Sequence, residues 1–406
     1  MSDLEFSVMA HGPTTADDLR PMLAKFEAEQ RVKINLRVFT WETGWTETMK
    51  FALYGHGPDV SEIGSTWVGT LAATGTLRPF GIREIAAVGG RYAFLHPSWQ
   101  SGYLTGQPEM WAMPWLGNVR FVFYRQAVFQ QAGLDATTAF RTPAQFMQTL
   151  TRLQDAGVSV PLVIPTSNSL NTLHTVAPLV WDAGGNFIDQ TGKHTIFNTA
   201  EARAGFRAYF DLHRYLAPAA QRLDTEQSDR FFLDGEAAVT ISDPGLLNTL
   251  LKSPPTGTGE ATPAATVRTA LPPGVPFVGG SNLVVWQHSP NHKLAVELVH
   301  FLTGQQNQIT YSQKARSLPV RLDALTGRPF ATDPLFHPAV EGLKLGRSYP
   351  TSRLWGLMEE KLIAELNEIW DELFTNPALD LDLALEEHLH PLGKRLDAIL
   401  ASDTRK

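Results

Sequence analysis

The sequence contains no cysteine among its 406 residues. This absence excludes disulfide bonds, cysteine-ligated zinc, iron–sulfur clusters and a thiol nucleophile. The sequence also lacks a basic block, since 34 Lys and Arg residues stand against 41 Asp and Glu residues, for a net charge of −7. Nucleic-acid binding needs clustered positive charge, so we expect no nucleic-acid partner.

Long hydrophobic runs are also missing, because no apolar segment reaches the roughly 20 residues that span a bilayer. The first residues, Met1 to Phe6, contain neither a basic segment nor an apolar stretch, so they do not form a signal peptide. Two alternatives stay open at this point. Either the protein is cytosolic, or it is exported and its signal has been removed.

Motifs for covalent chemistry are absent as well. We find no P-loop and no nucleophile elbow. The acidic pairs Glu359-Glu360, Asp371-Glu372 and Glu386-Glu387 are typical of solvated helix faces rather than of an acid–base couple. His388 and His390 are interpreted as surface or partly buried histidines rather than as a metal pair. We therefore expect no enzymatic activity, no cofactor and no metal site.

What the chain does contain is an alternation of strand-like and helix-like segments, which predicts an α/β fold. Hydrophobic residues make up 43% of the chain, enough for a packed core, and the length suggests two or three domains at about 150 residues each. The expected strands are 4–9, 32–38, 59–63, 119–124, 161–165 and 237–241. The expected helices cover about 16–26, 45–54, 142–157, 199–210, 289–304 and 354–374, and the Pro- and Gly-rich stretch 253–276 is expected to be irregular.

Tryptophan is abundant, and six of the ten lie in the first 115 residues: Trp41, Trp45, Trp67, Trp99, Trp111 and Trp115. Several stand in loops that follow expected strands. Sugar sites combine aromatic platforms, which cover C–H faces, with planar polar side chains, which bind hydroxyl groups. Both ingredients recur in these loops. Four of the ten tryptophans, Trp99, Trp111, Trp286 and Trp370, are interpreted as packing residues rather than as ligand contacts.

An ordered series of short segments points to a known family. It begins with Gly57–Val60, Trp67 and Gly75–Phe80, in a "PD-v … G-l-x-p-l" pattern. It continues with Met113–Trp115, Phe121–Arg125, Phe129–Leu134, Thr142–Phe146, Trp181–Gly185, Phe232–Val239, Gly279–Leu283, Ala295–Leu302 and Ser317–Arg321. Together these segments resemble, in order and over about residues 5 to 375, the bacterial extracellular solute-binding proteins of the maltose-binding type (family 1).

The resemblance implies a two-lobed α/β fold of the type II periplasmic-binding-protein class, with a hinge and a ligand cleft between the lobes. We expect one lobe to comprise 1–117 plus 275–322 and the other 118–274 plus 323–406. The crossovers are expected near 115–120, 272–280 and 320–328. Ligands of open α/β sheets bind at the carboxyl ends of strands, so we expect those ends to face the cleft.

Position along the family pattern also implies the ligand-binding residues. The set is His11, Trp41, Glu42, Trp45, Ser65, Thr66, Trp67, Trp115, Asn118, His174, Trp181, Asp243, Gly280, Ser281, Asn282, Arg353 and Trp355. Three of them have structural alternatives: Asn118 could satisfy hinge backbone groups, Trp181 could pack under the following double-glycine turn, and Asp243 could cap a helix.

Two departures from the family pattern argue against maltose itself. Asn118 stands where maltose binders carry an acidic residue, and Ser242–Gly245 stands where many members have Gly-Pro-Trp, so one tryptophan platform is missing. His11, His174 and Arg353 are compatible with a carboxylate or phosphate on the ligand. The charge of the ligand therefore stays open.

The function implied by the resemblance is that of the substrate-binding protein of an ABC importer. Such a protein captures a sugar, oligosaccharide or glycoside by hinge closure and delivers it to permease subunits in the membrane. A monomer in the periplasm or outside the cell is expected, with a lipoprotein anchor as a further alternative for the native form. Two other functions stay open: a carbohydrate-active enzyme using Glu42 and Asp243, and a binding protein for a polyamine or osmolyte. Polyamine sites need several carboxylates, and Glu42, Glu62 and Asp243 are few.

Overall fold

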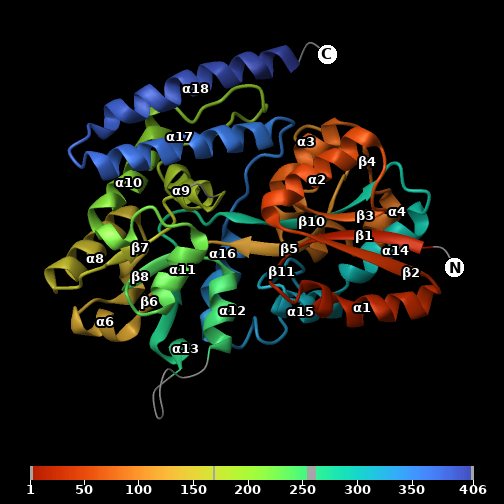
Figure 1. The fold of residues 1–406 in the computed structure, drawn as a ribbon, viewed down its shortest axis with the longest axis horizontal. Coiled ribbons are helices and arrows are strands. Elements are labelled where there is room, and N and C mark those ends of the chain that lie inside the picture. The colour runs from red at the N-terminus through yellow and green to blue at the C-terminus, as the bar shows by residue number, and fades with distance from the viewer. Residues whose placement is uncertain (1–2, 168–169, 254–261, 404–406) are drawn as a thin grey trace. The chain divides into compact units, whose positions relative to one another are not determined.

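The computed structural model describes residues 3–167, 170–253 and 262–403. The chain divides into two compact units. Unit 1 comprises Met1–Asn118, Val278–Pro334 and Ser348–Gly356, and unit 2 comprises Val119–Phe277, Leu335–Arg347 and Leu357–Lys406. Each unit contains a β-sheet covered by helices, so the α/β prediction is confirmed (Figure 1).

Unit 1 is built on a seven-stranded mixed sheet with the order β11-β5-β10-β3-β1-β2, to which β4 is added beside β10. Its strands are β1 (Asp3–Met9), β2 (Lys33–Phe39), β3 (Val60–Gly64), β4 (Leu77–Arg78), β5 (Met113–Val119), β10 (Val278–Trp286) and β11 (Leu318–Pro319). Strand β1 runs parallel to β2 and β3, whereas β10 is antiparallel to β3. Central strands of such a sheet are covered on both faces, which is why β3 is buried at every residue.

Helices cover both faces of this sheet, with α1 and α15 on one side and α2 and α3 on the other (Figure 1). The helices of unit 1 are α1 (Thr15–Gln30), α2 (Trp41–Tyr54), α3 (Val68–Ala73), α4 (Ile82–Ala87), α5 (His96–Gln100), α14 (His292–Leu302) and α15 (Gln305–Lys314), with 3₁₀ turns η1 (Ser65–Trp67) and η2 (Gly90–Ala93). Helix α2 begins four residues earlier than expected. Thr40 caps it, because its hydroxyl accepts a hydrogen bond from the backbone N–H of Thr43 at 3.3 Å.

Unit 2 is built on a four-stranded sheet with the order β7-β8-β6-β9. Its strands are β6 (Phe121–Arg125), β7 (Leu162–Val163), β8 (Val239–Ser242) and β9 (Val267–Ala270). Strand β6 is antiparallel to both β8 and β9, and β7 is parallel to β8. Strand β9 lies in the stretch that we expected to be irregular. That prediction is wrong for residues 263–270, because pairing with β6 gives the backbone of β9 a ladder that local composition does not reveal. Residues 254–261 of the same stretch lie outside the described residues.

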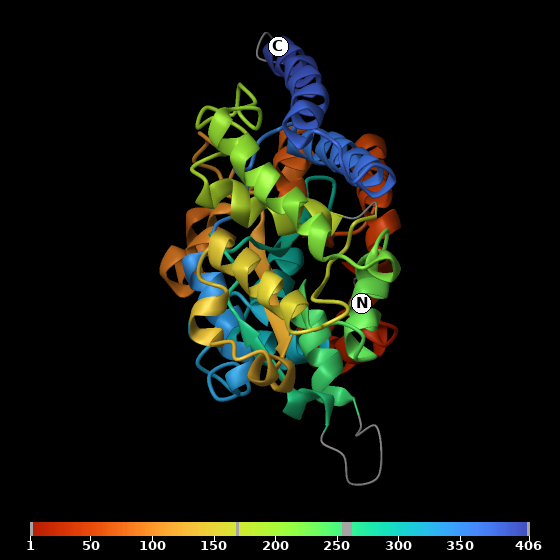
Figure 2. The ribbon, with the colours of Figure 1, turned by 90° about the vertical axis from the view of Figure 1, so that its left-hand side faces the viewer.

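The helices of unit 2 surround this sheet and include two long ones near the C-terminus. They are α6 (Gln126–Gln131), α7 (Ala136–Ala139), α8 (Pro143–Asp155), α9 (Leu170–Asp182), α10 (Ala200–Phe210), α11 (Thr225–Leu233), α12 (Pro244–Lys252), α13 (Pro263–Thr266), α16 (His337–Leu345), α17 (Trp355–Thr375) and α18 (Leu381–Asp403), with 3₁₀ turns η3 (Asp211–Tyr215), η4 (Pro218–Ala220) and η5 (Pro334–Phe336). Helices α17 and α18 lie side by side (Figure 1, Figure 2). The expected helices at α8, α10 and α17 are confirmed, and Thr142 and Thr199 cap α8 and α10 as predicted.

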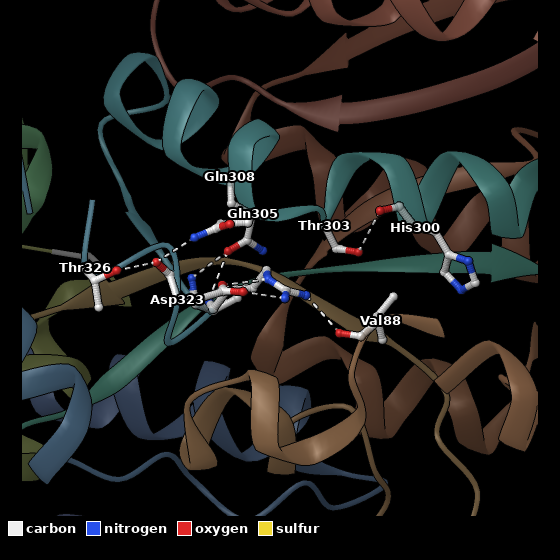
Figure 3. Close-up of polar contacts among 9 residues, drawn as sticks. Val88, His300, Thr303, Gln305, Gln308, Asp323 and Thr326 are labelled. Atoms are coloured by element: carbon white, nitrogen blue, oxygen red, sulfur yellow. Dashed lines mark hydrogen bonds and ion pairs between the residues drawn. The ribbon is translucent and has the colours of Figure 1, made fainter. Parts of the chain in front are cut away.

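The chain passes between the units after Asn118, Phe277, Pro334, Arg347 and Gly356, and the first two of these points lie in the ranges 115–120 and 272–280. The third expected range, 320–328, lies inside unit 1, and residues 323–334 and 348–356 belong to unit 1 rather than to the second lobe. The physical reason is a set of polar contacts after β11 (Figure 3). The carbonyl oxygen of the Gln308 side chain accepts hydrogen bonds from the backbone N–H groups of Val320 and Arg321, each at 3.0 Å.

Arg321 extends this attachment in the same segment. Its guanidinium donates to both carboxylate oxygens of Asp323, at 2.9 and 2.7 Å, and to the backbone carbonyl of Val88 at 2.8 Å (Figure 3). The backbone carbonyl of Asp323 accepts from the side chains of Gln305 (3.0 Å) and Thr326 (2.7 Å). A bidentate arginine–carboxylate pair is a strong and geometrically specific contact, so this segment is held to unit 1.

Candidate ligand-binding site

The strand ends of unit 1 bring several predicted residues to one edge of its sheet, here called the unit 1 edge. The parallel strands β1, β2 and β3 are followed by His11, Trp41 and Ser65, respectively. Strand β10 runs the opposite way and pairs Ser281 with Gly64, so the beginning of β10 lies at the same edge. Asn118 is the penultimate residue of β5 and ends the first segment of unit 1, and it is half-buried.

Three tryptophans of the unit 1 edge form one aromatic group. The ring of Trp67 lies edge-on to Trp41 and Trp45, with centroid distances of 5.6 and 5.3 Å. Trp67 is 6% exposed and packs on the core, whereas Trp41 and Trp45 are half-buried. Gly44 lies between Trp41 and Trp45 on α2, and a Cβ there would stand 2.4 Å from the sulfur of Met9 and 3.6 Å from the ring of Trp67. Trp41 and Trp45 therefore offer partly open aromatic faces, with Trp67 as their support.

His11 is held at this edge by a buried carboxylate that the sequence analysis did not place in the site. Its Nε2 lies 2.9 Å from Oε1 of Glu62, and Glu62 is fully buried in β3. The other oxygen of Glu62 accepts a hydrogen bond from the backbone N–H of Met9 at 2.8 Å. Glu62 lies in the short segment Val60–Gly64, which the sequence predicts as a buried strand, and no local pattern marks its carboxylate as the partner of His11.

Trp115 lies deeper than a ligand platform would. It is fully buried, stacks on Tyr311 at 5.0 Å with an interplanar angle of 10°, and contacts Phe6 and His11 edge-on. Burial, with the charge of Glu62 nearby, raises the pKa of Tyr311 far above the ordinary phenol value. The ring of Trp115 is thus enclosed by residues of unit 1 and contacts His11, and its expected contact with a ligand stays a prediction.

The double-glycine segment serves packing between strands. Gly280 has φ +129°, and a Cβ there would lie 2.0 Å from the backbone oxygen of Leu116, so only glycine lets β10 approach β5. Asn282 is buried, and its amide donates to the hydroxyl of Ser101 at 3.0 Å. This contact accounts for the buried amide of Asn282, and its expected role in ligand binding stays a prediction. Ser281 points to the opposite side of β10 and is also buried.

The remaining predicted residues of unit 1 differ in exposure. Trp355 is 1% exposed and stacks on Tyr349, with ring centroids 4.3 Å apart. Ser65 and Thr66 are half-buried in η1. Glu42, in the first turn of α2, and Arg353 are exposed, and the backbone carbonyl of Arg353 accepts a hydrogen bond from Thr70 at 2.9 Å.

Unit 2 has a corresponding edge, here called the unit 2 edge. Arg120 stands directly before β6 and Asp243 directly after β8, and the antiparallel pairing of Phe121 with Ser242 brings the two side by side. The guanidinium of Arg120 lies 3.3 Å from the carboxylate of Asp243. Asp243 also caps α12, because its carboxylate accepts from the backbone N–H of Gly245 at 2.7 Å. The alternative capping role is therefore confirmed, together with an ion pair that the sequence did not reveal.

A second carboxyl lies beside this pair. Asp229 on α11 accepts a hydrogen bond from the hydroxyl of Ser242 at 2.6 Å. Burial and the charge of Asp243 raise the pKa of Asp229 to about 7, against the opposing effect of Arg120. A carboxyl with this pKa exchanges its proton close to neutral pH.

His174 and Trp181, both on α9, take part in one stack with Phe277 and Arg347. The imidazole of His174 stacks on Phe277 at 4.0 Å, Phe277 faces Trp181 at 6.4 Å, and the guanidinium of Arg347 lies 4.7 Å from the Trp181 ring. Burial lowers the pKa of His174, and Glu359, whose carboxylate lies 3.6 Å away, offsets this only in part. A neutral imidazole in a stack is a donor and acceptor, not an anion-binding cation.

The prediction that the acidic pair Glu359-Glu360 lies on a solvated helix face is wrong for Glu359. Glu359 is 3% exposed and faces His174, whereas Glu360 is exposed. The first turns of α17 bury one side of the helix, and the pair spans its boundary, so only Glu360 belongs to a solvated face.

The packing interpretation of four tryptophans is supported by their positions: Trp99, Trp286 and Trp370 are at most 5% exposed, and Trp111 packs against the core of unit 1.

Metal and membrane features were searched for in the described part of the chain. Within residues 3–167, 170–253 and 262–403, no group of three His, Asp or Glu side chains is placed to hold a metal ion. In the same residues, no helix combines the length and the apolar character that crossing a bilayer requires.

Comparisons with known proteins agree with this architecture. A comparison with curated protein sequences finds no match. Three similar solved structures are the sugar-binding protein MalE from Xanthomonas citri (19% identity, TM-score 0.82, covering 99% of this chain and 98% of that one), an ABC transporter solute-binding protein from Thermotoga lettingae bound with α-D-tagatose (18%, 0.79, 98% and 100%), and the cyclic α-maltosyl-1,6-maltose binding protein from Arthrobacter globiformis (17%, 0.77, 98% and 98%). These likenesses show the fold.

A sequence profile of a protein family decides the assignment, because it matches residues 12–309, well over half of the chain. This stretch contains most of the elements of both units, and it contains the residues of the unit 1 edge other than His11. The chain therefore belongs to the bacterial extracellular solute-binding proteins.

Proposed function

We propose that this protein is the substrate-binding subunit of an ABC importer and that its ligand is a sugar, an oligosaccharide or a glycoside. The observation that carries the proposal is the aromatic group of Trp41, Trp45 and Trp67 at the unit 1 edge. Half-buried indole rings beside half-buried hydroxyl side chains, Ser65 and Thr66, match the C–H faces and hydroxyl groups of a sugar ring.

In this proposal one ligand contacts both units and favours the closed arrangement. A ligand shifts such an equilibrium only by its differential contacts with the two states, so groups on each unit must take part. Aromatic residues of the unit 1 edge and the polar residues of the unit 2 edge are the proposed partners. Membership of the family supports delivery of the ligand to permease subunits.

The two alternatives have less support. Glu42 is exposed in the first turn of α2, and Asp243 is engaged with Arg120 and with the α12 backbone, so neither residue is arranged as a glycosidase acid. Polyamine recognition requires carboxylates around aromatic rings, whereas Glu62 is committed to His11 and Met9.

Isothermal titration against a saccharide panel tests the proposal. Maltose, trehalose, cellobiose, maltotriose and α-D-tagatose are titrated into the full chain, with putrescine and glycine betaine as non-sugar probes. Saturable heat with at least one saccharide is the expected result. Heat with putrescine or betaine alone, or turnover of an aryl glycoside that Glu42→Gln abolishes, replaces the sugar-binding function with one of the alternatives.

A further inference from the structure

Two of the connections that lead from unit 2 to unit 1 are paired with each other. Phe277 and Arg347 are the last residues of unit 2 before these connections, and Val278 and Ser348 are the first residues of unit 1 after them. Phe277 and Arg347 form a parallel β-bridge, and the backbone N–H of Arg347 donates to the carbonyl oxygen of Pro276 at 3.0 Å. The hydroxyl of Ser348 donates to the carbonyl oxygen of Val278 at 2.5 Å. The two connections thus form one ribbon, here called the crossover ribbon (residues 276–278 and 347–348).

Both unit 2 residues of the crossover ribbon contact α9. The buried ring of Phe277 faces two rings of this helix, that of His174 at 4.0 Å with an interplanar angle of 12° and that of Trp181 at 6.4 Å with an angle of 24°. His174 and Trp181 lie about two helical turns apart and therefore share one face of α9. The guanidinium of Arg347 lies 4.7 Å from the centroid of the Trp181 ring. Each strand of the ribbon thus has a side chain that packs on the same helix.

The backbone that leads into the ribbon is fitted to the same face. Gly274 has φ +91°, and a Cβ there would lie 2.4 Å from the backbone oxygen of Pro178 on α9, so only glycine allows this approach. The N–H of Val275 donates to that oxygen at 3.3 Å. Pro178 stands between His174 and Trp181 on α9. Backbone and side-chain contacts therefore attach the beginning of the ribbon to one stretch of α9.

The contact of Arg347 is an attraction between a cation and an aromatic ring. Arg347 is half-buried, and burial lowers the pKa of its guanidinium. A guanidinium over an indole face is attracted by the ring, and the attraction grows as the cation loses water. Replacing the guanidinium by a neutral amide therefore weakens the attachment of the second strand of the ribbon to Trp181.

His174 connects this attachment to the unit 2 edge. Its imidazole lies in the field of Arg120 and Asp243, which stand at that edge. The rings of His174 and Phe277 are in direct contact, and close-packed side chains transmit displacements because no empty space absorbs them. A shift of His174 at the unit 2 edge therefore reaches Phe277 at the beginning of the crossover ribbon.

A further connection between the units reaches the same histidine. The chain returns to unit 2 inside helix α17, because Gly356 belongs to unit 1 and Leu357 to unit 2. One turn later, the carboxylate of Glu359 lies 3.6 Å from Nε2 of His174. His174 thus contacts residues next to two of the places where the chain passes between the units.

We propose that Phe277 and Arg347 are positioning residues of the interunit hinge: they anchor the crossover ribbon to α9 and so limit the arrangements of the two units in the ligand-free protein, and His174 couples a ligand at the unit 2 edge to this anchor. This inference rests on the proposed sugar-binding function. The apparent affinity of a ligand is its intrinsic affinity multiplied by the fraction of protein in the binding-competent arrangement. Loosening the anchor lowers this fraction, so it weakens the binding of every ligand by the same factor.

The variants remove the anchor and preserve the surrounding fold. Phe277→Leu removes the stacked ring and keeps an apolar side chain. Arg347→Gln removes the cation and keeps the backbone N–H that donates to Pro276. Phe187→Leu is the matched control for the first, because Phe187 also contacts Trp181, edge-on at 6.2 Å, but lies inside a segment of unit 2 away from any connection.

Arg222→Gln is the matched control for Arg347→Gln. The guanidinium of Arg222 lies 5.2 Å from the ring of Phe374, and both residues belong to unit 2. Circular dichroism and the melting temperature verify the folding of every variant before the binding measurements.

The closing experiment combines single-molecule energy transfer with calorimetry. Dyes are attached at Ile82→Cys in unit 1 and Gln130→Cys in unit 2, both exposed positions, and the saccharide panel is titrated into each protein. Without ligand, we expect broader distributions of transfer efficiency in Phe277→Leu and Arg347→Gln than in the wild type and in the two controls. Saturating saccharide should restore the wild-type distribution. Affinity should fall roughly three- to tenfold in the two anchor variants, by one common factor for all saccharides that bind.

The outcomes separate the inference from the proposed function. Ligand-free distributions in both anchor variants that equal that of the wild type overturn the inference alone. Losses of affinity that differ severalfold between saccharides indicate direct ligand contacts and overturn it as well, as do equal effects in the anchor variants and their controls. The absence of binding to every saccharide overturns the proposed function and the inference with it.

Discussion

The imidazole of His388 on α18 lies 2.8 Å from the carboxylate of Glu365 on α17, measured from Nδ1 to Oε2. Its Nε2 lies 3.2 Å from a second carboxylate of α17, that of Glu372. Arg395 donates to the other oxygen of Glu365 at 3.0 Å. Both ring nitrogens of His388 thus face acceptors on the neighbouring helix, which is an arrangement that only the doubly protonated imidazole satisfies.

This arrangement makes the docking of α18 depend on pH. Burial alone would lower the pKa of His388, but the hydrogen bonds with Glu365 and Glu372 outweigh it and raise the pKa above 6.5. A folded-state pKa above the unfolded value stabilises the fold fully below the unfolded pKa, and this stability is lost as pH rises through the folded pKa. We expect His388→Gln to lower the free energy of unfolding by about 1 kcal/mol at pH 6 and by less at pH 9. Urea unfolding at the two pH values measures the difference.

The exposed His337 provides the control for this prediction. His337→Gln should give the same small change in unfolding free energy at both pH values. A loss of stability in His388→Gln that is equal at pH 6 and pH 9 contradicts the role of imidazolium in holding α18.

Gly280 is expected to be intolerant of substitution. Gly280→Ala forces a Cβ toward the backbone oxygen of Leu116, 2.0 Å away, at a φ of +129°. Both effects destabilise the contact between β10 and β5, and we expect a loss of about 3 kcal/mol in unfolding free energy. Gly75→Ala is the matched variant, because Gly75 has φ +71° but open space around it, so about 1 kcal/mol is expected there. Equal losses in the two variants would show that the contact with Leu116 is not limiting.

The aromatic group of the unit 1 edge is expected to dominate sugar affinity. Trp41→Ala and Trp45→Ala each remove a half-buried indole face, and we expect each to weaken saccharide binding roughly tenfold with little effect on stability. Tyr92→Ala is the control, since Tyr92 is an aromatic residue of unit 1 that is 80% exposed outside this group. Titration calorimetry provides the dissociation constants. Unchanged affinity in both tryptophan variants is incompatible with their role as platforms.

The proposed closure of the two units on ligand can be tested by fluorescence, because the absence of cysteine leaves the chain free for site-specific labels. Ile82→Cys in unit 1 and Gln130→Cys in unit 2 place dyes at exposed positions. We expect the transfer efficiency between the dyes to change saturably with a bound saccharide, with the same midpoint as the calorimetric titration. A labelled pair within unit 1, Ile82→Cys with Leu53→Cys, should not respond. A transfer efficiency that is constant at saturating saccharide argues against ligand-driven closure.

Local features of this chain are readable from sequence wherever the physical cause is local. Thr142 with Pro143 and Gln145 predicts the beginning of α8, since a cap, a fixed φ and a reciprocal hydrogen bond are all encoded within four residues. The strands β1 and β3 follow from short apolar runs in the same way. Strand β9 and helix α18 were not predicted from the sequence, and they show the limit of local patterns. Strand β9 depends on pairing with a partner strand. Helix α18 contains a proline and relies on packing against α10 and α17.

Membership of the solute-binding family and the two-unit α/β organisation were thus predictable from the sequence, because both depend on the order of short segments and on hydrophobic periodicity. The electrostatics of the candidate site were not. Arg120 meets Asp243, His11 meets Glu62, and His174 meets Phe277 across 123, 51 and 103 positions, and no local pattern marks these pairs. These pairs form because strand pairing and helix packing bring the residues together. A buried charge or ring is then stabilised by the neighbouring side chain that the tertiary structure places beside it.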